Sequence, residues 1–263
     1  MTTERSAQVF GGQLKEWRNR RRMSQLDFSL EAEISQKHLS FIETGRSTPS
    51  RDMVIHLTEC LDVPLRERNT LLLAAGYAPL YLARDLDDPS LTAARAAIDL
   101  LLKGHEPYPA IAIDRHWNML AANAAVPAML AGVTEQSLLA QSINVLRLSL
   151  HPGGLAPQIV NLPQWKKHLL ERLRHQINVT ADEVLIDLMD ELKSYPCPDS
   201  DLNAPDEGYG DVFVPFEFLV PDGKLSFFST TTVFGTPVDV TLSEIAIESF
   251  FPANDATRKA LSV

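Results

Sequence analysis

The sequence predicts an all-α N-terminal domain followed by an α+β domain, whose antiparallel sheet has about five strands with helices over it. Two observations support this prediction. Apolar residues recur at helical spacing through residues 12–75, whereas residues 108–122 and 212–251 contain short apolar runs between turn residues and one alternating segment at residues 244–251. At 263 residues the chain is long enough for two hydrophobic cores, and we place the domains at residues 1–82 and 83–263.

The N-terminal domain is predicted to begin with a basic helix over residues 12–22 and to continue with a pair of short helices. Ser24 can cap the first helix of the pair, because a serine oxygen accepts from the unpaired backbone N–H groups of a first turn. Asp27 adds a negative charge where the helix dipole favours one. The predicted inward side chains of this helix are Leu26, Leu30 and Phe28.

A turn then separates the two short helices. Ser35 is placed to cap the second one, and Gly45 follows its last residue, where a left-handed backbone conformation is usually needed. Two further helices are predicted over residues 50–61 and 64–75, and Gly76 ends the last of them.

The outward face of the second short helix carries side chains that can read DNA. Gln can hydrogen-bond adenine bidentately, Lys can donate to guanine, and Ser and Phe can contact base edges or a thymine methyl group. In helix-turn-helix proteins the first residues of the recognition helix reach the bases. Polar outward residues also occur in ordinary helical bundles, which is the alternative interpretation. The predicted DNA-contacting residues are Gln25, Ser35, Gln36, Lys37, Ser40, Phe41, Arg46 and Arg51.

The net charge of −10 is unevenly distributed. Residues 1–82 carry eleven Lys or Arg and ten Asp or Glu, a net charge of +1, whereas residues 83–263 carry thirteen and twenty-four, a net charge of −11. Around the helix pair, residues 10–51 carry a net charge of +3. Positive charge is therefore concentrated where DNA would lie, and a single module of this size is expected to bind DNA as one half of a dimer.

The C-terminal domain is predicted to open with a helix over residues 90–103 that Ser90 caps. Strands over residues 108–113 and 117–122 follow, and Asn123 is placed to cap a short helix after them.

Helices are then predicted over residues 142–150 and 161–175, and Thr180 with Glu183 forms a capping-box pattern that opens a third helix. Three strands complete the sheet, with a turn signal of Pro, Asp and Gly between the first two. These strands cover residues 212–220, 224–233 and 244–251.

Several protein classes lack support in the sequence. No G-x-S-x-G, H-E-x-x-H, P-loop or G-x-G-x-x-G pattern occurs, so we do not expect an enzyme. Cys60 and Cys197 form neither a disulfide framework nor a C-x-x-C metal motif. The first ten residues lack the apolar core of a signal peptide, and no apolar run approaches the roughly 18 residues of a membrane span. We therefore expect a cytoplasmic protein that does not enter a membrane.

Two regions resemble known families. Residues 8–63, with the stretch SQKHLSFIETGRSTPSRDMV, resemble the helix-turn-helix of the XRE (Cro/repressor-like) family. The segments HEPYPAIAIDRHWNMLAANAA, NVLRLSLHPGG and FFSTTTVFGTPVDVTLSEIAIESFFPAND resemble, in the same order, the ligand-binding domain of MmyB-like transcription regulators. This second resemblance covers residues 90–260. It implies a PAS-like sensor that holds a small, mainly apolar ligand, with fatty acids as the leading class.

A fatty-acid site needs an apolar tunnel and one or two groups that meet a carboxylate. Arg147 and His151 share a face if their helix reaches His151, and an arginine suits bidentate contact with a carboxylate. With Phe227, Phe228 and Phe234 as apolar walls, these are the predicted ligand-binding residues. The alternatives are that Arg147 pairs with one of the many acidic residues and that the phenylalanines belong to the core.

The sequence thus predicts a transcriptional regulator that binds double-stranded DNA sequence-specifically, forms a homodimer and senses a small apolar ligand. We expect no metal, and no cofactor other than a bound fatty acid or a similar apolar molecule. One alternative is a ligand-independent repressor or antitoxin-like protein whose C-terminal domain binds another protein. A second alternative is an enzyme tethered to DNA.

Overall fold

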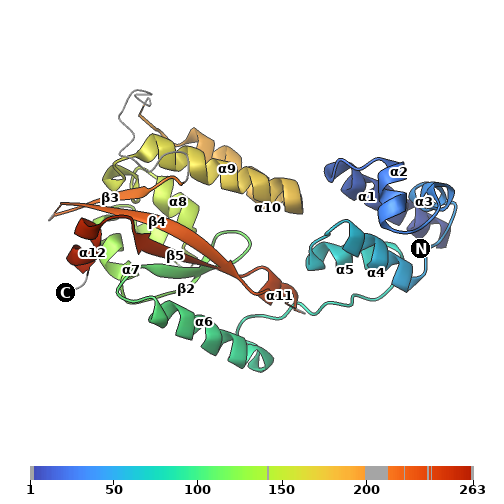
Figure 1. Cartoon of the computed structure of the whole chain (residues 1–263), viewed down its shortest axis with the longest axis horizontal. Helices are drawn as coiled ribbons and strands as arrows, with labels where there is room; N and C mark the ends of the chain where they lie inside the picture. The colour runs from blue at the N-terminus through green and yellow to red at the C-terminus, as the bar shows by residue number, and fades with distance from the viewer. Residues whose placement is uncertain are drawn as a thin grey trace. The chain divides into compact units, whose positions relative to one another are not determined.

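The computed structural model describes residues 3–140, 142–198, 213–221, 223–235, 237 and 239–261 (Figure 1). The chain divides into two compact units, each with its own hydrophobic core. The first unit comprises Met1–Asp85, Asn178–Ala181 and Pro237–Ser243, and the second comprises Leu86–Ile177, Asp182–Thr236 and Glu244–Val263.

The main part of the first unit consists of α1 (Thr3–Arg20), α2 (Gln25–Glu31), α3 (Gln36–Glu43), α4 (Arg51–Cys60) and α5 (Leu65–Ala74). Each helix contributes to one core, in which the side chains of Phe10, Phe28, Ile42, Leu57 and Leu71 are almost completely excluded from solvent. This all-α arrangement confirms the fold that the helical spacing of apolar residues predicts.

The inward face of α2 differs from the prediction. Leu26 and Leu30 are 52% and 69% exposed, so their predicted inward orientation is wrong, whereas Phe28, Ser29 and Ala32 are buried. Leu26 and Leu30 lie four residues apart and share one face, and Phe28 and Ala32 share another. Because Ser29 and Ala32 are small, this second face can approach the neighbouring helices closely, and it is the one that packs.

The second unit is built on a five-stranded sheet with the strand order β2-β1-β5-β4-β3, in which all neighbouring strands are antiparallel. This sheet confirms the predicted α+β class. The first of the three C-terminal strands begins later than predicted, and Val212 and the turn residue Asp222 lie outside the described residues. The strands are β1 (Ala110–Ile113), β2 (Met119–Ala122), β3 (Phe216–Val220), β4 (Gly223–Val233) and β5 (Ala246–Pro252).

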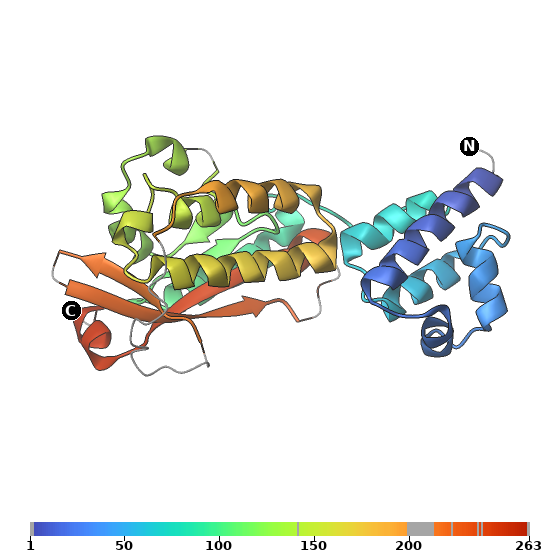
Figure 2. The same cartoon turned by 90° about the horizontal axis from the view of Figure 1, so that it is seen from above.

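Helices lie on both sides of this sheet. In Figure 1, α6 (Thr92–Gly104) lies on one side, and α9 (Leu162–Thr180) and α10 (Glu183–Ser194) lie on the other. Figure 2, seen from above, shows α9 and α10 in front of the sheet. Burial along β1 agrees, because every one of its four residues is buried although successive side chains point to opposite faces. The remaining helices of this unit include the 3₁₀ turn η1 (Pro89–Leu91), α7 (Val126–Met129), α8 (Val145–Leu150) and α12 (Asp255–Leu261).

Two helices of this unit begin differently from the prediction. Ser90 does not cap α6, because Asp88 accepts from the Ser90 N–H at 2.8 Å and starts η1 just ahead of the helix. Thr180 does not cap α10, because α9 continues through Thr180. Asp182 caps α10 instead by accepting from the Val184 N–H at 3.0 Å.

The predicted capping role of Asn123 is also wrong, because no side chain caps the start of α7. Its buried side chain joins three segments of backbone. Asn123 Oδ1 accepts from the Ala110 N–H at 3.2 Å, and Nδ2 donates to the carbonyls of Tyr108 at 2.7 Å and Leu102 at 3.2 Å. Asn123 therefore ties α6 and the start of β1 to the end of β2, which a side chain engaged in a cap could not do.

Among the helices of the described residues, none combines the length and the apolar character needed to cross a membrane.

Candidate DNA-binding helix and ligand pocket

Side-chain caps fix the start of each helix of the α2–α3 pair. Ser24 Oγ accepts from the Asp27 N–H at 3.1 Å, and Asp27 Oδ2 accepts from the Ser24 N–H at 3.2 Å, which completes a capping box. Hydrogen bonds from the side chain and backbone of Ser24 lower the pKa of Asp27. Ser35 Oγ caps α3 by accepting from the His38 N–H at 3.1 Å. The caps that the sequence predicts are therefore present at both positions.

Left-handed backbone sets the turn and the end of α3. Glu33 in the turn has φ of 51°, and Gly45 after α3 has φ of 72°. A Cβ atom at position 45 would come within 2.7 Å of Gln8. Glycine is therefore needed at this position for space as well as for its backbone conformation.

The carboxylate of Glu43 connects α3 to the two helices before it. Arg18 of α1 donates to it from Nε at 2.6 Å and from Nη2 at 3.0 Å. Gln25, the first residue of α2, donates to it from Nε2 at 2.7 Å. Because the carboxylate is buried and accepts three hydrogen bonds, it holds α3 in a defined orientation against α1 and α2.

Two of the predicted DNA-contacting residues make hydrogen bonds within the protein. Ser35 is engaged as the cap of α3, and Gln25 is engaged with Glu43. Lys37 Nζ lies 5.7 Å from the centre of the Phe41 ring, so these two side chains lie side by side on α3. The exposed members of the set are Ser35, Gln36, Lys37, Arg46 and Arg51, and the half-buried members are Gln25, Ser40 and Phe41.

An apolar pocket lies in the second unit. About 700 Å³ of empty space lies within it, a volume that includes open solvent at its mouth. Fifteen of its eighteen lining residues are apolar, and they come from β1, β2, β3, β5 and the helices α7 to α9 with their neighbouring loops. They are Pro109, Ile111, Trp117, Met119, Val126, Met129, Leu130, Val145, Leu146, Leu148, Leu155, Trp165, Leu169, Phe216 and Phe250.

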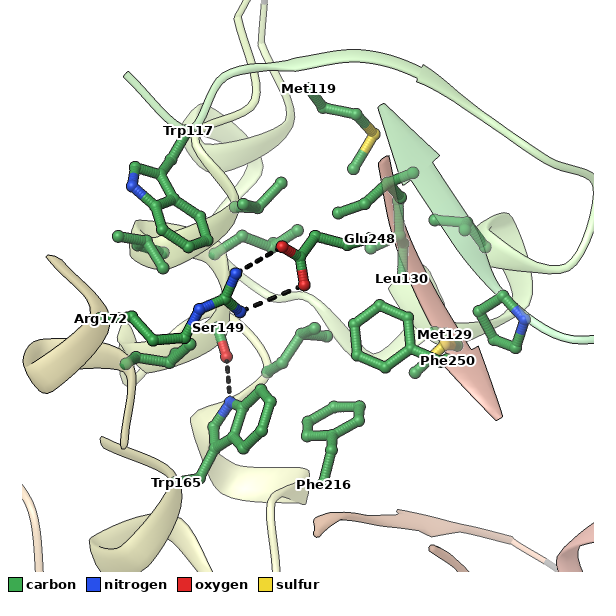
Figure 3. Close-up of a pocket in the computed structure, with 18 residues that line it drawn as sticks. Trp117, Met119, Met129, Leu130, Ser149, Trp165, Arg172, Phe216, Glu248 and Phe250 are labelled. Carbon is green, nitrogen blue, oxygen red and sulfur yellow. Dashed lines mark hydrogen bonds and ion pairs between the residues drawn. The ribbon is translucent and has the colours of Figure 1, made fainter. Parts of the chain in front are cut away.

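The three other lining residues are polar, and each has a partner in the structure (Figure 3). Ser149 Oγ accepts from Trp165 Nε1 at 3.0 Å. Arg172 and Glu248 form a bidentate ion pair with hydrogen bonds of 2.5 and 3.1 Å. The indole N–H of Trp117 donates away to Gln176 at 2.7 Å. The pocket is therefore mainly apolar, and its two charged residues neutralise each other.

None of the five residues predicted to bind the ligand lines this pocket. Arg147 instead donates from Nε and Nη2 to Glu191 at 2.7 to 2.9 Å, so it pairs with an acid, as the alternative interpretation states. The helix α8 ends at Leu150, and His151 has extended backbone, so His151 does not share a helical face with Arg147. The ring of His151 instead packs edge-on against the ring of Tyr195, with ring centres 5.1 Å apart.

The phenylalanines also lie outside the pocket lining. Phe227 is fully buried and packs against Phe216, which does line the pocket, with ring centres 6.3 Å apart. Phe228 alternates with it along β4 and stacks on Phe251 instead. Phe234 follows the end of β4 and is half-buried.

Arg172 and Glu248 were missed as site residues. Glu248 had a detectable signal, because it is a charged residue within the apolar strand sequence EIAIESFF, and a buried charge needs a partner. Arg172 had no comparable signal, since it is one of several basic residues in α9.

The fold and these two sites define a DNA-binding transcription regulator with a ligand-binding domain. Residues 14–68 match the family model for a helix-turn-helix, and residues 94–263 match the model for the MmyB-like transcription regulator ligand binding domain. Since the second match covers more than half of the chain, the protein belongs to the MmyB-like transcription regulators. No curated protein sequence matches the chain.

Proposed function

We propose that the protein is a homodimeric regulator that binds operator DNA through α3 and changes its operator affinity when a small apolar ligand, such as a fatty acid, occupies the pocket. The observation that carries this proposal is the pocket lining, in which fifteen of the eighteen residues are apolar. A binding surface for another protein would not need such an interior volume. The antiparallel sheet with the pocket between it and α8 and α9 supports a PAS-like sensor.

On the DNA side, we assign base reading to Gln36, Lys37 and Ser40 on α3, whose chemistry suits base edges in the major groove. Arg46 and Arg51 follow α3, are exposed and suit phosphate contacts. Ser35 and Gln25 contribute by positioning α3, through the cap and through Glu43.

A homodimer is proposed because one such module buries too little surface for tight specific binding, whereas two modules can read half-sites about 34 Å apart. To act as a switch, the ligand must bind the DNA-competent and incompetent arrangements of the dimer with different affinities.

The test is operator binding by delipidated full-length protein, measured by fluorescence anisotropy at fixed salt with and without dodecanoic acid or its methyl ester. A shift in operator affinity by either probe supports the proposal. Equal operator affinity in all three samples, with at least one probe shown to be bound, contradicts it.

Native mass spectrometry separates this proposal from an antitoxin-like function. A dimer that carries a lipid mass supports the sensor, whereas a stoichiometric second protein without lipid supports the alternative.

A further inference from the structure

The ion pair between Arg172 on α9 and Glu248 on β5 stands in the wall of the apolar pocket (Figure 3). Nη2 of Arg172 donates to Oε1 of Glu248 at 2.5 Å, and Nη1 donates to Oε2 at 3.1 Å. The side chains are 27% and 5% exposed, respectively. Of the described residues that line the pocket, only these two carry a charge.

Neighbouring strands and one aromatic ring hold this pair in place. Glu248 is aligned with Thr231 on β4 and with Ile111 on β1. Thr231 Oγ1 accepts from Arg172 Nη2 at 3.0 Å and donates to Glu248 Oε1 at 2.8 Å. The guanidinium carbon of Arg172 lies 4.9 Å from the centre of the Trp117 ring. These contacts fix the orientation of the pair, which is therefore an ordered part of the pocket wall rather than a flexible surface ion pair.

The charges of this pair affect how well the pocket can bind a charged ligand. A carboxylate beside it would meet the positive charge of Arg172 and the negative charge of Glu248 at similar distances, so attraction and repulsion would largely cancel. The carboxylate would still lose its hydration on entering the pocket. The balance of these effects is unfavourable for an anion.

An uncharged polar group does not meet this penalty. Arginine has five N–H donors, and the contacts of Arg172 with Glu248 and Thr231 use three of them. A carbonyl oxygen of an ester, an amide or a protonated carboxylic acid can accept from a remaining donor without displacing Glu248.

We propose that the ligand of this pocket is an apolar chain that ends in an uncharged carbonyl group, and that Glu248 excludes carboxylate anions by neutralising Arg172. This inference rests on the proposed function of the pocket as an apolar ligand site. A fatty acid would then bind in its protonated form, and an ester or amide would bind more tightly than the ionised acid.

The test compares dodecanoate with methyl dodecanoate, titrated into delipidated full-length protein by calorimetry below their aggregation limits and well above the pKa of the acid. We expect the wild type to bind the ester at least about tenfold more tightly than the carboxylate, because the carboxylate loses its hydration in the pocket and meets no net positive charge that would compensate. Because the ester is also more hydrophobic, the decisive measurement is how this preference changes among variants of the pair.

A series of variants changes the charge at the pair step by step. Glu248→Gln leaves a net positive charge and should reverse the preference, so that the carboxylate binds about tenfold more tightly than the ester. Arg172→Gln leaves a net negative charge and should increase the preference for the ester by about tenfold over wild type. The double variant is neutral and should keep the wild-type preference. Arg147→Gln is the matched control, because this arginine pairs with Glu191 outside the pocket lining, and it should also keep that preference.

Each outcome decides the inference. A wild type that prefers the carboxylate, or a Glu248→Gln variant that keeps the wild-type preference, overturns it while leaving an apolar-ligand function intact. A wild type that binds neither probe overturns both proposals. If Glu248→Gln does not fold, as a thermal melt would show, Arg172→Gln decides instead, and an unchanged preference in that variant overturns the inference.

Discussion

Arg18 on α1 and Glu43 on α3 form an ion pair whose side chains are only 7% and 1% exposed. The pair joins residues 25 positions apart in the sequence, and Gln25 on α2 donates to the same carboxylate. Three helices of the first unit therefore meet at one buried negative charge. The orientation of the recognition helix depends on this charge rather than on apolar packing alone.

Replacing Glu43 with Gln should strongly destabilise the first unit, because it leaves the Arg18 guanidinium buried without a counter-charge. The expected loss in the free energy of unfolding is about 3–5 kcal/mol. Urea titration measures the loss, and hydrogen exchange shows whether it falls on α1 and α3. Glu59→Gln is the control, because the Glu59 side chain is 53% exposed in its pair with Arg68 and should contribute less than about 1 kcal/mol. Equal losses in the two variants would show that the Arg18–Glu43 pair is not buried in solution.

Substitutions on α3 and just after it should affect DNA binding in two distinguishable ways. Gln36→Ala removes a proposed base contact and should weaken operator binding by about 1–3 kcal/mol while leaving binding to scrambled DNA unchanged. Arg46→Ala removes a proposed phosphate contact and should weaken binding to both DNAs. It should also reduce the slope of the logarithm of the binding constant against the logarithm of the salt concentration by about one. Fluorescence anisotropy across a salt series measures both effects. Uniform weakening by Gln36→Ala would assign Gln36 to the backbone instead.

The sequence was sufficient for the features that depend on near neighbours. The caps at Ser24 and Ser35 involve partners three residues away, so the local pattern predicts them. The choice of the inward face of α2 was not predictable in this way. The spacing of Leu26 and Leu30 is as regular as that of Phe28 and Ala32, and only packing against the other helices selects between the two faces.

The residues of the ligand pocket were even harder to predict from the local sequence. Arg172 and Glu248 are 76 positions apart, and they meet because the register of β5 between β1 and β4 turns Glu248 toward α9. No local pattern encodes that register. Arg147 was the more prominent candidate in the sequence, but its partner Glu191 lies 44 positions away and holds it outside the pocket lining.

Tyr195 offers a test of the contacts around Arg147. Burial, together with the hydrogen bond that its hydroxyl donates to Glu191, raises the pKa of Tyr195 to about 12, from about 10 in an unfolded chain. The folded state therefore favours the protonated phenol. This contribution to stability is fully present below about pH 10 and is lost as the pH rises toward about 12.

The difference in phenolate absorbance between wild type and Tyr195→Phe isolates the titration of this tyrosine. Glu191→Gln should move its midpoint down toward pH 10, because the nearby negative charge is removed. Glu183→Gln, at the exposed start of the same helix, should leave the midpoint unchanged. A midpoint that stays near 12 in Glu191→Gln would assign the whole shift to burial.

Two adjacent glycines of α1 give a final prediction with an internal control. A Cβ atom at Gly11 would lie 2.3 Å from the carbonyl oxygen of Ile42 and 2.7 Å from that of Glu43, whereas a Cβ atom at Gly12 meets nothing within 4 Å among the described residues. Alanine at either position gains about 0.5–1 kcal/mol of helix stability over glycine. Gly12→Ala should therefore raise the free energy of unfolding by about this amount. Gly11→Ala must push α3 away from α1, at a cost of about 1–3 kcal/mol that exceeds the gain, and should also weaken operator binding. Urea titration and anisotropy measure the two effects, and stabilisation by both substitutions would show that α1 does not lie against the end of α3.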